Sequence, residues 1–179
     1  EDALRVVRGI VDGGDAKILD HLELALSRPV RAVTPGQSGV LFGADDRVLD
    51  LGAGLAGPAR MLAASPGCRV DCIELSADYC VGARLLNRLT GLADRVAIHE
   101  GSALAMPFSD ASFDVVWMQN VGMNIADKRG LYDEVRRVLA PGGRFAFQEM
   151  AAGEGSVAYF PLPWASAPSD HCLISIDEM

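Results

Sequence analysis

The sequence predicts an α/β fold, in which helices cover both faces of a doubly wound, mainly parallel sheet. Two observations lead to this prediction. Short apolar runs alternate with helical patterns along most of the chain, and a glycine-rich segment joins the first of these runs to a helix. Since neighbouring parallel strands are joined by a crossover, which is usually a right-handed helix, the alternation favours a parallel sheet.

Five apolar runs have the length of buried strands and are bounded by turn-forming residues. The strands are expected at Arg47–Leu51, Arg69–Glu74, Val96–His99, Phe113–Met118 and Arg144–Met150.

Three helices are expected between these strands. Pro58 suits the first turn of one helix, where its missing N–H group is not needed. Ser76 is a good N-cap for the second helix, which Gly91 is expected to end. Asp127 opens the third, whose apolar residues recur every three or four positions, and Pro141–Gly143 is expected to stop it.

The chain divides into three parts. Residues 1–40 are expected to form a cap, with a helix at Ala16–Leu26 followed by a linker. Residues 41–150 are the core. Residues 151–179 begin as a substrate-side loop rich in Gly, Pro and Ser, and Ser175–Glu178 then matches a capping box, which predicts the start of a further, truncated C-terminal part.

Composition narrows the class of protein. The 179 residues are 50% hydrophobic with a formal net charge of −8, which suits a globular domain with one core. No apolar run reaches the roughly 18 residues of a membrane span, and no basic segment precedes an apolar run as in a signal peptide. We therefore expect a soluble, cytoplasmic protein without a membrane partner.

The charges and cysteines argue against two further kinds of site. The basic residues are dispersed, whereas a nucleic-acid surface needs clustered Lys and Arg. The four cysteines lack the paired spacing of a metal site and are expected to be free thiols of a reducing compartment: Cys68, Cys72, Cys80 and Cys172. We expect no nucleic acid and no metal, while a homo-oligomer remains open.

The glycine-rich segment carries the clearest chemical signal. Gly52, Gly54 and Gly57 lie between a strand and a helix, where glycine permits a tight turn and close approach of a ligand. Glu74, at the end of the next strand, can accept hydrogen bonds from ribose hydroxyls. Both features also fit a nicotinamide dinucleotide, so an NAD(P)-dependent oxidoreductase is one alternative. Asp50 would crowd a pyrophosphate but suits a ligand with a cationic amino-acid end.

Asp50–Gly57 resembles motif I of the class I S-adenosylmethionine-dependent methyltransferases, and the likeness runs from about Asp46 to Met150. The later segments that carry it are Val70–Ser76, Gly101–Phe108, Phe113–Trp117 and Arg137–Gly143. The resemblance implies a Rossmann-like fold, with S-adenosylmethionine as cofactor and S-adenosylhomocysteine as product.

The same resemblance implies the cofactor-binding residues. They are Asp50, Gly52, Ala53, Gly54, Gly57, Glu74, Leu75, Ser102, Ala103 and Gln119. Ser102 departs from the Asp that is common in the family, so the adenine is expected to meet an uncharged acceptor or the Ala103 backbone N–H. A second departure is that the family's two last strands, an antiparallel hairpin, are missing, which predicts an open sheet edge.

Finer features resemble a small-molecule subgroup that includes glycine, sarcosine and dimethylglycine N-methyltransferases. They lie at Gly57–Arg60, Leu86–Leu92, Gln119–Ile125 and Phe160–Ala165. The implied reaction is methyl transfer to an amine nitrogen, or to an oxygen or carbon of a metabolite. It proceeds by in-line displacement, in which the protein mainly positions donor and acceptor.

The candidates on the acceptor side follow the fourth strand or lie in the long loop. The catalytic candidates are Gln119, Tyr159 and His171, with His21 as a further candidate base. The substrate-binding candidates are Asn120, Tyr159 and Trp164, because amide groups orient a substrate and aromatic faces attract a cationic amine. Aromatic residues that only pin the loop, and a non-catalytic module that binds the cofactor, remain alternatives.

Overall fold

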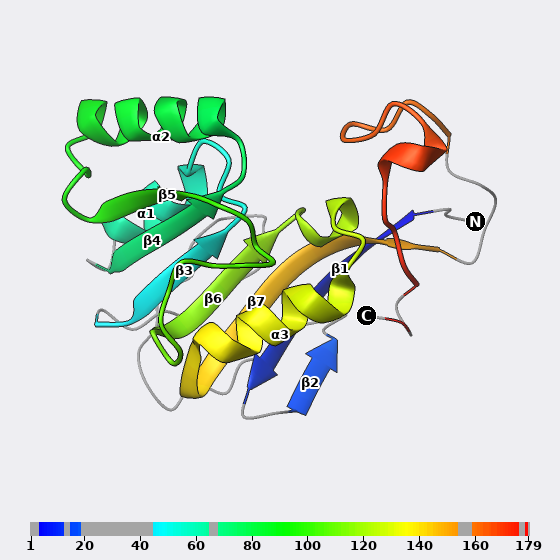
Figure 1. The fold of residues 1–179 in the computed structure, drawn as a ribbon, viewed down its shortest axis with the longest axis horizontal. Helices are drawn as coiled ribbons and strands as arrows, with labels where there is room; N and C mark the ends of the chain where they lie inside the picture. The colour runs from blue at the N-terminus through cyan, green and yellow to red at the C-terminus, as the bar shows by residue number, and fades with distance from the viewer. Residues whose placement is uncertain are drawn as a thin grey trace.

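The computed structural model describes residues 4–12, 15–18, 45–64, 68–153, 159–175 and 178, the first two ranges as backbone only. These residues form a seven-stranded sheet in the order β2-β1-β7-β6-β3-β4-β5 (Figure 1).

The five strands from β7 to β5 are parallel to one another. They are β3 (Arg47–Leu51), β4 (Arg69–Glu74), β5 (Val96–Glu100), β6 (Phe113–Gln119) and β7 (Leu139–Ala152). All five predicted strands are therefore confirmed. The chain adds strands on one side of β3 up to β5 and then on its other side from β6, so the strand order reverses between β3 and β6.

Helices cover both faces of the sheet. α1 (Gly57–Ala64) and α2 (Ala77–Leu89) lie on one face and α3 (Lys128–Val138) on the other (Figure 1). The Ser76 side chain accepts a hydrogen bond from an N–H group in the first turn of α2, and Asp127 does the same for α3. Both predicted helix starts are confirmed.

The predicted end of the third helix was wrong. α3 ends one residue before β7 begins at Leu139, whose extended backbone already pairs with Phe113. Pro141–Gly143 therefore lies within β7, where the register with β6 shifts between Phe113 and Val115. Gly142 has φ +75°, and this left-handed residue lets the strand absorb the additional residues of the bulge.

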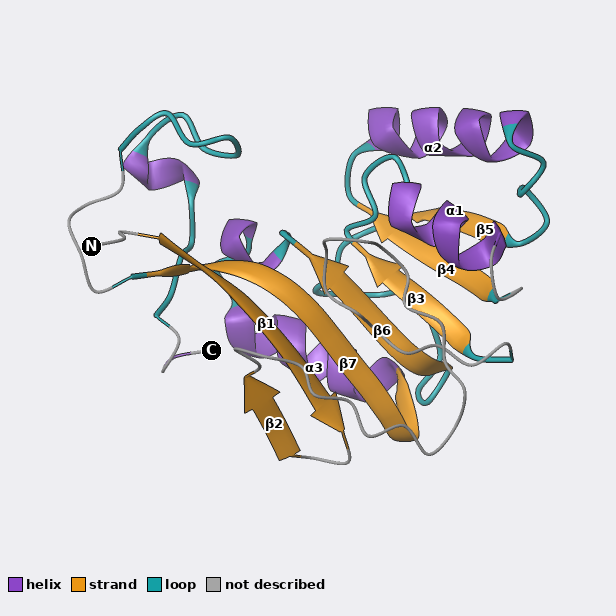
Figure 2. Cartoon of the chain, turned by 180° about the vertical axis from the view of Figure 1, so that it is seen from behind, coloured by secondary structure: helices purple, strands orange, loops and turns teal. Residues whose placement is uncertain are grey.

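The N-terminal part also differs from the prediction. β1 (Leu4–Asp12) pairs antiparallel with β7, and β2 (Asp15–Ile18) pairs antiparallel with β1 (Figure 2). Residues 16–18 are thus strand rather than the start of a helix. The rest of the helix predicted at Ala16–Leu26, with His21, lies outside the described residues.

Because β1 occupies the free side of β7, the expected open edge at this position was also wrong. A sheet edge is satisfied by any extended segment whose N–H and C=O groups meet it, whatever its place in the sequence.

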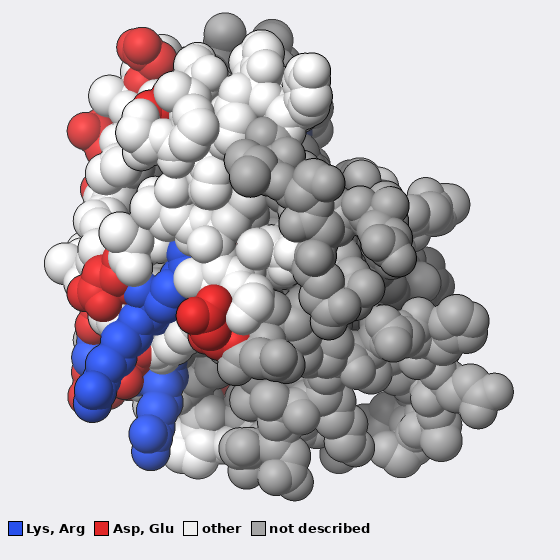
Figure 3. Space-filling model, turned by 90° about the vertical axis from the view of Figure 1, so that its right-hand side faces the viewer, with Lys and Arg blue, Asp and Glu red and all other residues white. Residues whose placement is uncertain are grey.

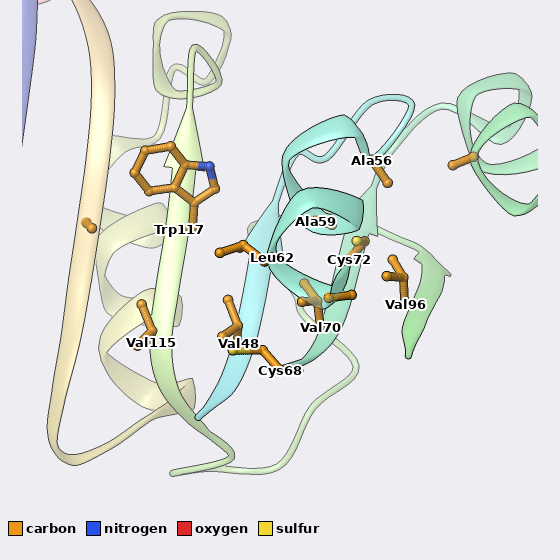
Figure 4. Packing of buried hydrophobic residues seen from close by; sticks show 13 residues of the cluster. Val48, Ala56, Ala59, Leu62, Cys68, Val70, Cys72, Val96, Val115 and Trp117 are labelled. Atoms are coloured by element: carbon orange, nitrogen blue, oxygen red, sulfur yellow. The ribbon is translucent and has the colours of Figure 1, made fainter. Parts of the chain in front are cut away.

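Two clusters of buried hydrophobic residues sandwich the sheet. The first lies between the sheet and α1 and α2 and includes Val48, Leu62 and Trp117 (Figure 4). The second lies under α3 and includes Leu49 and Leu131. Val48 and Leu49 are adjacent on β3 and point to opposite faces. Burial on both faces explains why the strands read as continuous apolar runs.

The described surface has no long basic stripe on the face in Figure 3, where Lys and Arg side chains lie beside Asp and Glu. In the described ranges, no helix is long and apolar enough to cross a membrane. The same ranges contain no group of three or more His, Cys, Asp or Glu residues able to hold a metal ion. All four cysteines are free thiols, and Cys172 is the one that is not fully buried.

Candidate functional site

A pocket of about 390 Å³ opens where β3 and β6 end side by side. Its lining residues are Asp50, Gly52, Ala53, Pro58, Gln119 and Asn120. Ligands of open α/β sheets bind beyond the carboxyl ends of the strands, at the point where the strand order reverses. The structure thus brings five of the predicted site residues together, and Pro58 joins them.

The glycine-rich turn after β3 forms one wall of the pocket. The N–H groups of Gly52 and Ala53 donate to the Ile73 carbonyl oxygen at 2.8 and 3.2 Å, which anchors the turn to β4. A Cβ atom on Gly52 would collide with the Val121 side chain. Gly54 has φ +55°, and a Cβ atom there would meet nothing within 4 Å. Gly52 is therefore required by packing, whereas Gly54 leaves free space that a ligand can fill.

Glu74 lies at the end of β4, as the sequence predicted, and it also holds the glycine-rich turn. Its carboxylate accepts the Gly54 N–H at 2.8 Å and the Ser76 N–H at 2.9 Å. A carboxylate has about four lone-pair sites, so two of them remain for hydroxyl groups of a ligand. The next side chain, Leu75, is 74% exposed and offers an apolar surface beside Glu74.

Asp50 is buried at the inner end of the pocket, with 3% of its surface exposed. The Ala59 N–H bonds to its carboxylate, while Oδ2 is buried without a hydrogen-bond partner. Burial raises the pKa of Asp50 to about 7, the Ala59 hydrogen bond opposes this rise, and the charge of Glu74 adds to it. A buried, unpaired carboxylate oxygen calls for a cationic or donor group on a ligand. It fits an ammonium group and repels a pyrophosphate.

The loop after β5 lies next to Glu74. The Gly101 N–H donates to the Glu74 carbonyl oxygen at 3.0 Å, and the half-buried Ser102 and Ala103 follow directly. Arg137 of α3 fixes the far part of this loop by donating to two of its carbonyl oxygens at 2.7 and 3.0 Å. Ser102 and Ala103 do not line the 390 Å³ pocket but lie on the side of Glu74 and Leu75.

The predicted acceptor-side residues separate into two groups. Gln119 ends β6 and lines the pocket together with Asn120, which has φ +56°. Tyr159 is 95% exposed and does not line the pocket. The phenol faces water in the described part of the chain, so the role of Tyr159 in catalysis or substrate binding stays a prediction.

Trp164 and His171 also lie outside the lining of the pocket. The indole N–H of Trp164 is buried without a hydrogen-bond partner. His171 stacks on Phe160 with ring centroids 5.5 Å apart, and its Nδ1 atom accepts the Leu173 N–H at 3.2 Å. His171 thus packs within the segment that follows β7, and neither residue is among those that line the pocket.

Two residues near the pocket were missed by sequence reasoning. Glu149 is 1% exposed and accepts hydrogen bonds from the backbone of residues 121–123. Lys128 binds the carbonyl groups of the same turn. The available signal was an acid inside the apolar run Arg144–Met150, because Glu is rarely buried without a partner. For Lys128 the sequence offered no signal beyond its place at a helix start.

Two family models match the chain. The model described as a methyltransferase domain matches residues 49–147, which include the glycine-rich turn, Glu74 and both residues at the end of β6. A second model, the aminomethyltransferase beta-barrel domain, matches residues 15–55. This stretch is too short to establish a second membership, and its last strand, β3, lies inside the parallel sheet.

Similar proteins include several named methyltransferases. A sarcosine/dimethylglycine N-methyltransferase of Aphanothece halophytica is 39% identical over 79% of this chain and 49% of the relative. A sterol 24-C-methyltransferase of Eremothecium gossypii is 38% identical over 61% of this chain and 29% of the relative. The chain therefore spans half or less of the curated relatives it matches.

Among solved structures, the geranyl diphosphate C-methyltransferase of Streptomyces coelicolor has a TM-score of 0.66 and 26% identity, over 76% of this chain and 50% of that one. Its fold agrees with the Rossmann-like architecture described above. Because the first family model covers more than half of the chain, including the turn and the acid of the pocket, this chain belongs to the methyltransferase domain family.

Proposed function

We propose that this chain binds S-adenosylmethionine and is the cofactor-binding part of an enzyme that methylates a small molecule. The observation that carries the proposal is the pocket between β3 and β6, with the unpaired Asp50 oxygen at its inner end and open space at Gly54. The named relatives, which act on amines, sterols and geranyl diphosphate, support a small-molecule acceptor.

Each part of the cofactor has a suitable group nearby. Asp50 would accept hydrogen bonds from the ammonium group, and Glu74 from the ribose hydroxyls. Leu75, Ser102 and Ala103 would surround the adenine. When bound, S-adenosylmethionine supplies a methyl group on a sulfonium, which is a good leaving group for in-line attack. The negative charge of Asp50 and its poor fit to a pyrophosphate disfavour the alternative nicotinamide cofactor.

The chemistry left to the protein is mainly orientation. Gln119 and Asn120 would hold the acceptor at the mouth of the pocket, and the apolar walls would exclude water. Apart from Asp50, which we assign to the ammonium group of the cofactor, none of the described lining residues has a side chain that could act as a base. This favours an acceptor that attacks without losing a proton first, such as a neutral amine.

An acceptor screen tests the proposal. Purified protein and S-adenosylmethionine are incubated with a panel of small amines, sterols, isoprenoids and phenols, and S-adenosylhomocysteine is measured. We expect product with a small molecule, and with amines before phenols. Binding of NADH and no binding of S-adenosylmethionine in a calorimetric titration would contradict the proposal.

A further inference from the structure

The turn after β6 is held by the last residues of β7. Its first N–H group, that of Asn120, donates to the Gln148 carbonyl oxygen at 2.8 Å. The next three, those of residues 121–123, donate to the Glu149 carboxylate at 2.8, 2.9 and 3.2 Å. Four consecutive backbone donors are thus satisfied by two neighbouring residues of another strand.

Glu149 acts as a cap for the short 3-10 helix at Gly122–Asn124. The residue at the usual cap position, Val121, makes no side-chain hydrogen bond to the helix. A helix cap ordinarily comes from the residue just before the helix, whereas this one comes from a strand 26 to 28 positions away in sequence. The carboxylate is almost completely buried. This desolvation raises the pKa of Glu149, and the three N–H bonds and the charge of Lys128 oppose the rise.

The turn that Glu149 holds is a wall of the pocket. Gln119 and Asn120 line it, and Asn120 has φ +56°, a strained conformation that persists where the surroundings fix it. Val121 fills the space over Gly52, where no Cβ atom fits. A shift of this turn would therefore move two lining residues and the glycine-rich turn opposite them.

The carbonyl groups of the same turn are held by Lys128. Its Nζ atom donates to Gly122 O at 2.6 Å, to Ile125 O at 2.5 Å and to Cys172 O at 2.6 Å. The Cys172 N–H in turn donates to Met123 O at 2.7 Å. The turn is therefore held by hydrogen bonds at both its N–H and its C=O groups, and the segment around Cys172 is bound to it.

We propose that Glu149 is a positioning residue for the cofactor pocket, acting through the backbone of residues 121–123. This inference rests on the proposed function, because it assumes that the pocket binds S-adenosylmethionine. Preformed walls strengthen binding, since the protein loses less conformational freedom when the ligand enters. Packing alone would not require a carboxylate here, because an apolar side chain of similar volume avoids the desolvation.

The test compares Glu149→Gln with Asp114→Asn in the full chain. Glu149→Gln keeps the size of the side chain but replaces one acceptor oxygen by a donor NH₂ group. Asp114 on β6 also accepts a backbone N–H, that of Arg47 at 2.9 Å, but at the opposite end of the strand. Circular dichroism establishes that both variants are folded. Calorimetric titration of S-adenosylmethionine is expected to show about tenfold weaker binding for Glu149→Gln and a change within about twofold for Asp114→Asn.

Amide hydrogen exchange gives a second readout that needs neither cofactor nor activity. We expect the N–H groups of residues 121–123 to exchange as slowly as those of β7 in the wild type, and about a hundredfold faster in Glu149→Gln. If Glu149→Gln does not fold, the exchange rates of the wild-type protein still test the inference. Exchange of the N–H groups of residues 121–123 at the rate of an open loop would overturn it.

The outcomes separate the two proposals. A wild-type protein that does not bind S-adenosylmethionine would contradict the proposed function. A wild type that binds, together with a folded Glu149→Gln that binds equally well, would overturn the positioning role and leave the proposed function standing.

Discussion

Asp50 is a buried carboxylate near the end of β3 that lines the pocket. Because its pKa is raised to about 7, the folded protein holds a proton between about pH 4 and 7 that the unfolded chain has already lost. The folded state therefore binds more protons in this window, and its stability falls as pH rises through it. Asp50→Asn removes this dependence. Urea unfolding at pH 5 and pH 8 should show that the wild type loses stability relative to Asp50→Asn, and equal changes in both proteins would contradict the raised pKa.

The same residue predicts a pH dependence of cofactor binding. A bound ammonium group favours the charged carboxylate, so binding should release the Asp50 proton and strengthen as pH rises toward 7. We expect Asp50→Asn to weaken S-adenosylmethionine binding about tenfold at pH 8 and less at pH 6. Calorimetry at the two pH values measures this, and an equal loss at both would mean that Asp50 does not meet a cation.

Gly54 and Gly142 form a matched pair for testing the glycine-rich turn. Both have positive φ values, +55° and +75°, and a Cβ atom on either would meet nothing within 4 Å. Valine at each position is therefore strained to a similar degree. Gly54→Val places its side chain beside the pocket and should abolish cofactor binding in a folded protein. Gly142→Val, at the opposite end of the sheet, should leave the affinity within about twofold. Retained binding by Gly54→Val would show that no ligand approaches this turn.

At the scale of elements, Arg137 connects α3 to the loop beside Glu74. It binds two loop carbonyl groups, and it forms ion pairs with Glu134 and Asp110 at 2.7 and 3.0 Å. Arg137→Ala should lower the melting temperature by about 5 °C, because several charge-assisted hydrogen bonds are lost together. Arg129 on the same helix is the control, since its side chain is 94% exposed and has a single ion pair at 3.8 Å. An equal shift for Arg129→Ala would contradict the special role of Arg137.

The elements that the sequence predicted well are those whose signals are local. β3 and β6 are buried on both faces, and the caps Ser76 and Asp127 act within one helical turn. The errors arose where a distant partner decides. Pro141–Gly143 became part of β7 because β6 pairs with the residues on either side of it, Leu139 and Arg144. The sequence carries no local sign of β1, because its partner β7 lies more than a hundred residues away.

For the site, too, the sequence predicted the residues whose signals are local and missed those that depend on distant contacts. Asp50, Gly54 and Glu74 stand in a motif whose spacing places them together. Glu149 and Tyr159 depend on tertiary contacts: the first is drawn into the core by three backbone N–H groups, and the second is carried outward by a loop. Neither outcome follows from spacing along the chain.

At the scale of the whole molecule, β1 completes the sheet beside β7. It pairs antiparallel with β7 over nine residues, from Leu4 opposite Ala152 to Asp12 opposite Arg144. Deleting residues 1–18 should expose the β7 edge, which then becomes a template for pairing between molecules. Light scattering should detect faster aggregation of the shortened protein on mild heating. Equal aggregation of both proteins would mean that β1 does not protect this edge.

The central claim is that the glycine-rich turn and Glu74 together bind the nucleoside of S-adenosylmethionine. The most direct measurement is a calorimetric titration of S-adenosylmethionine into the wild type, Glu74→Ala and Glu100→Ala. Glu100 lies opposite Glu74 on the neighbouring strand and is the matched control. We predict saturable binding to the wild type and to Glu100→Ala, and at least about tenfold weaker binding to Glu74→Ala. No binding to the wild type, or equal binding to the wild type and Glu74→Ala, would contradict the account.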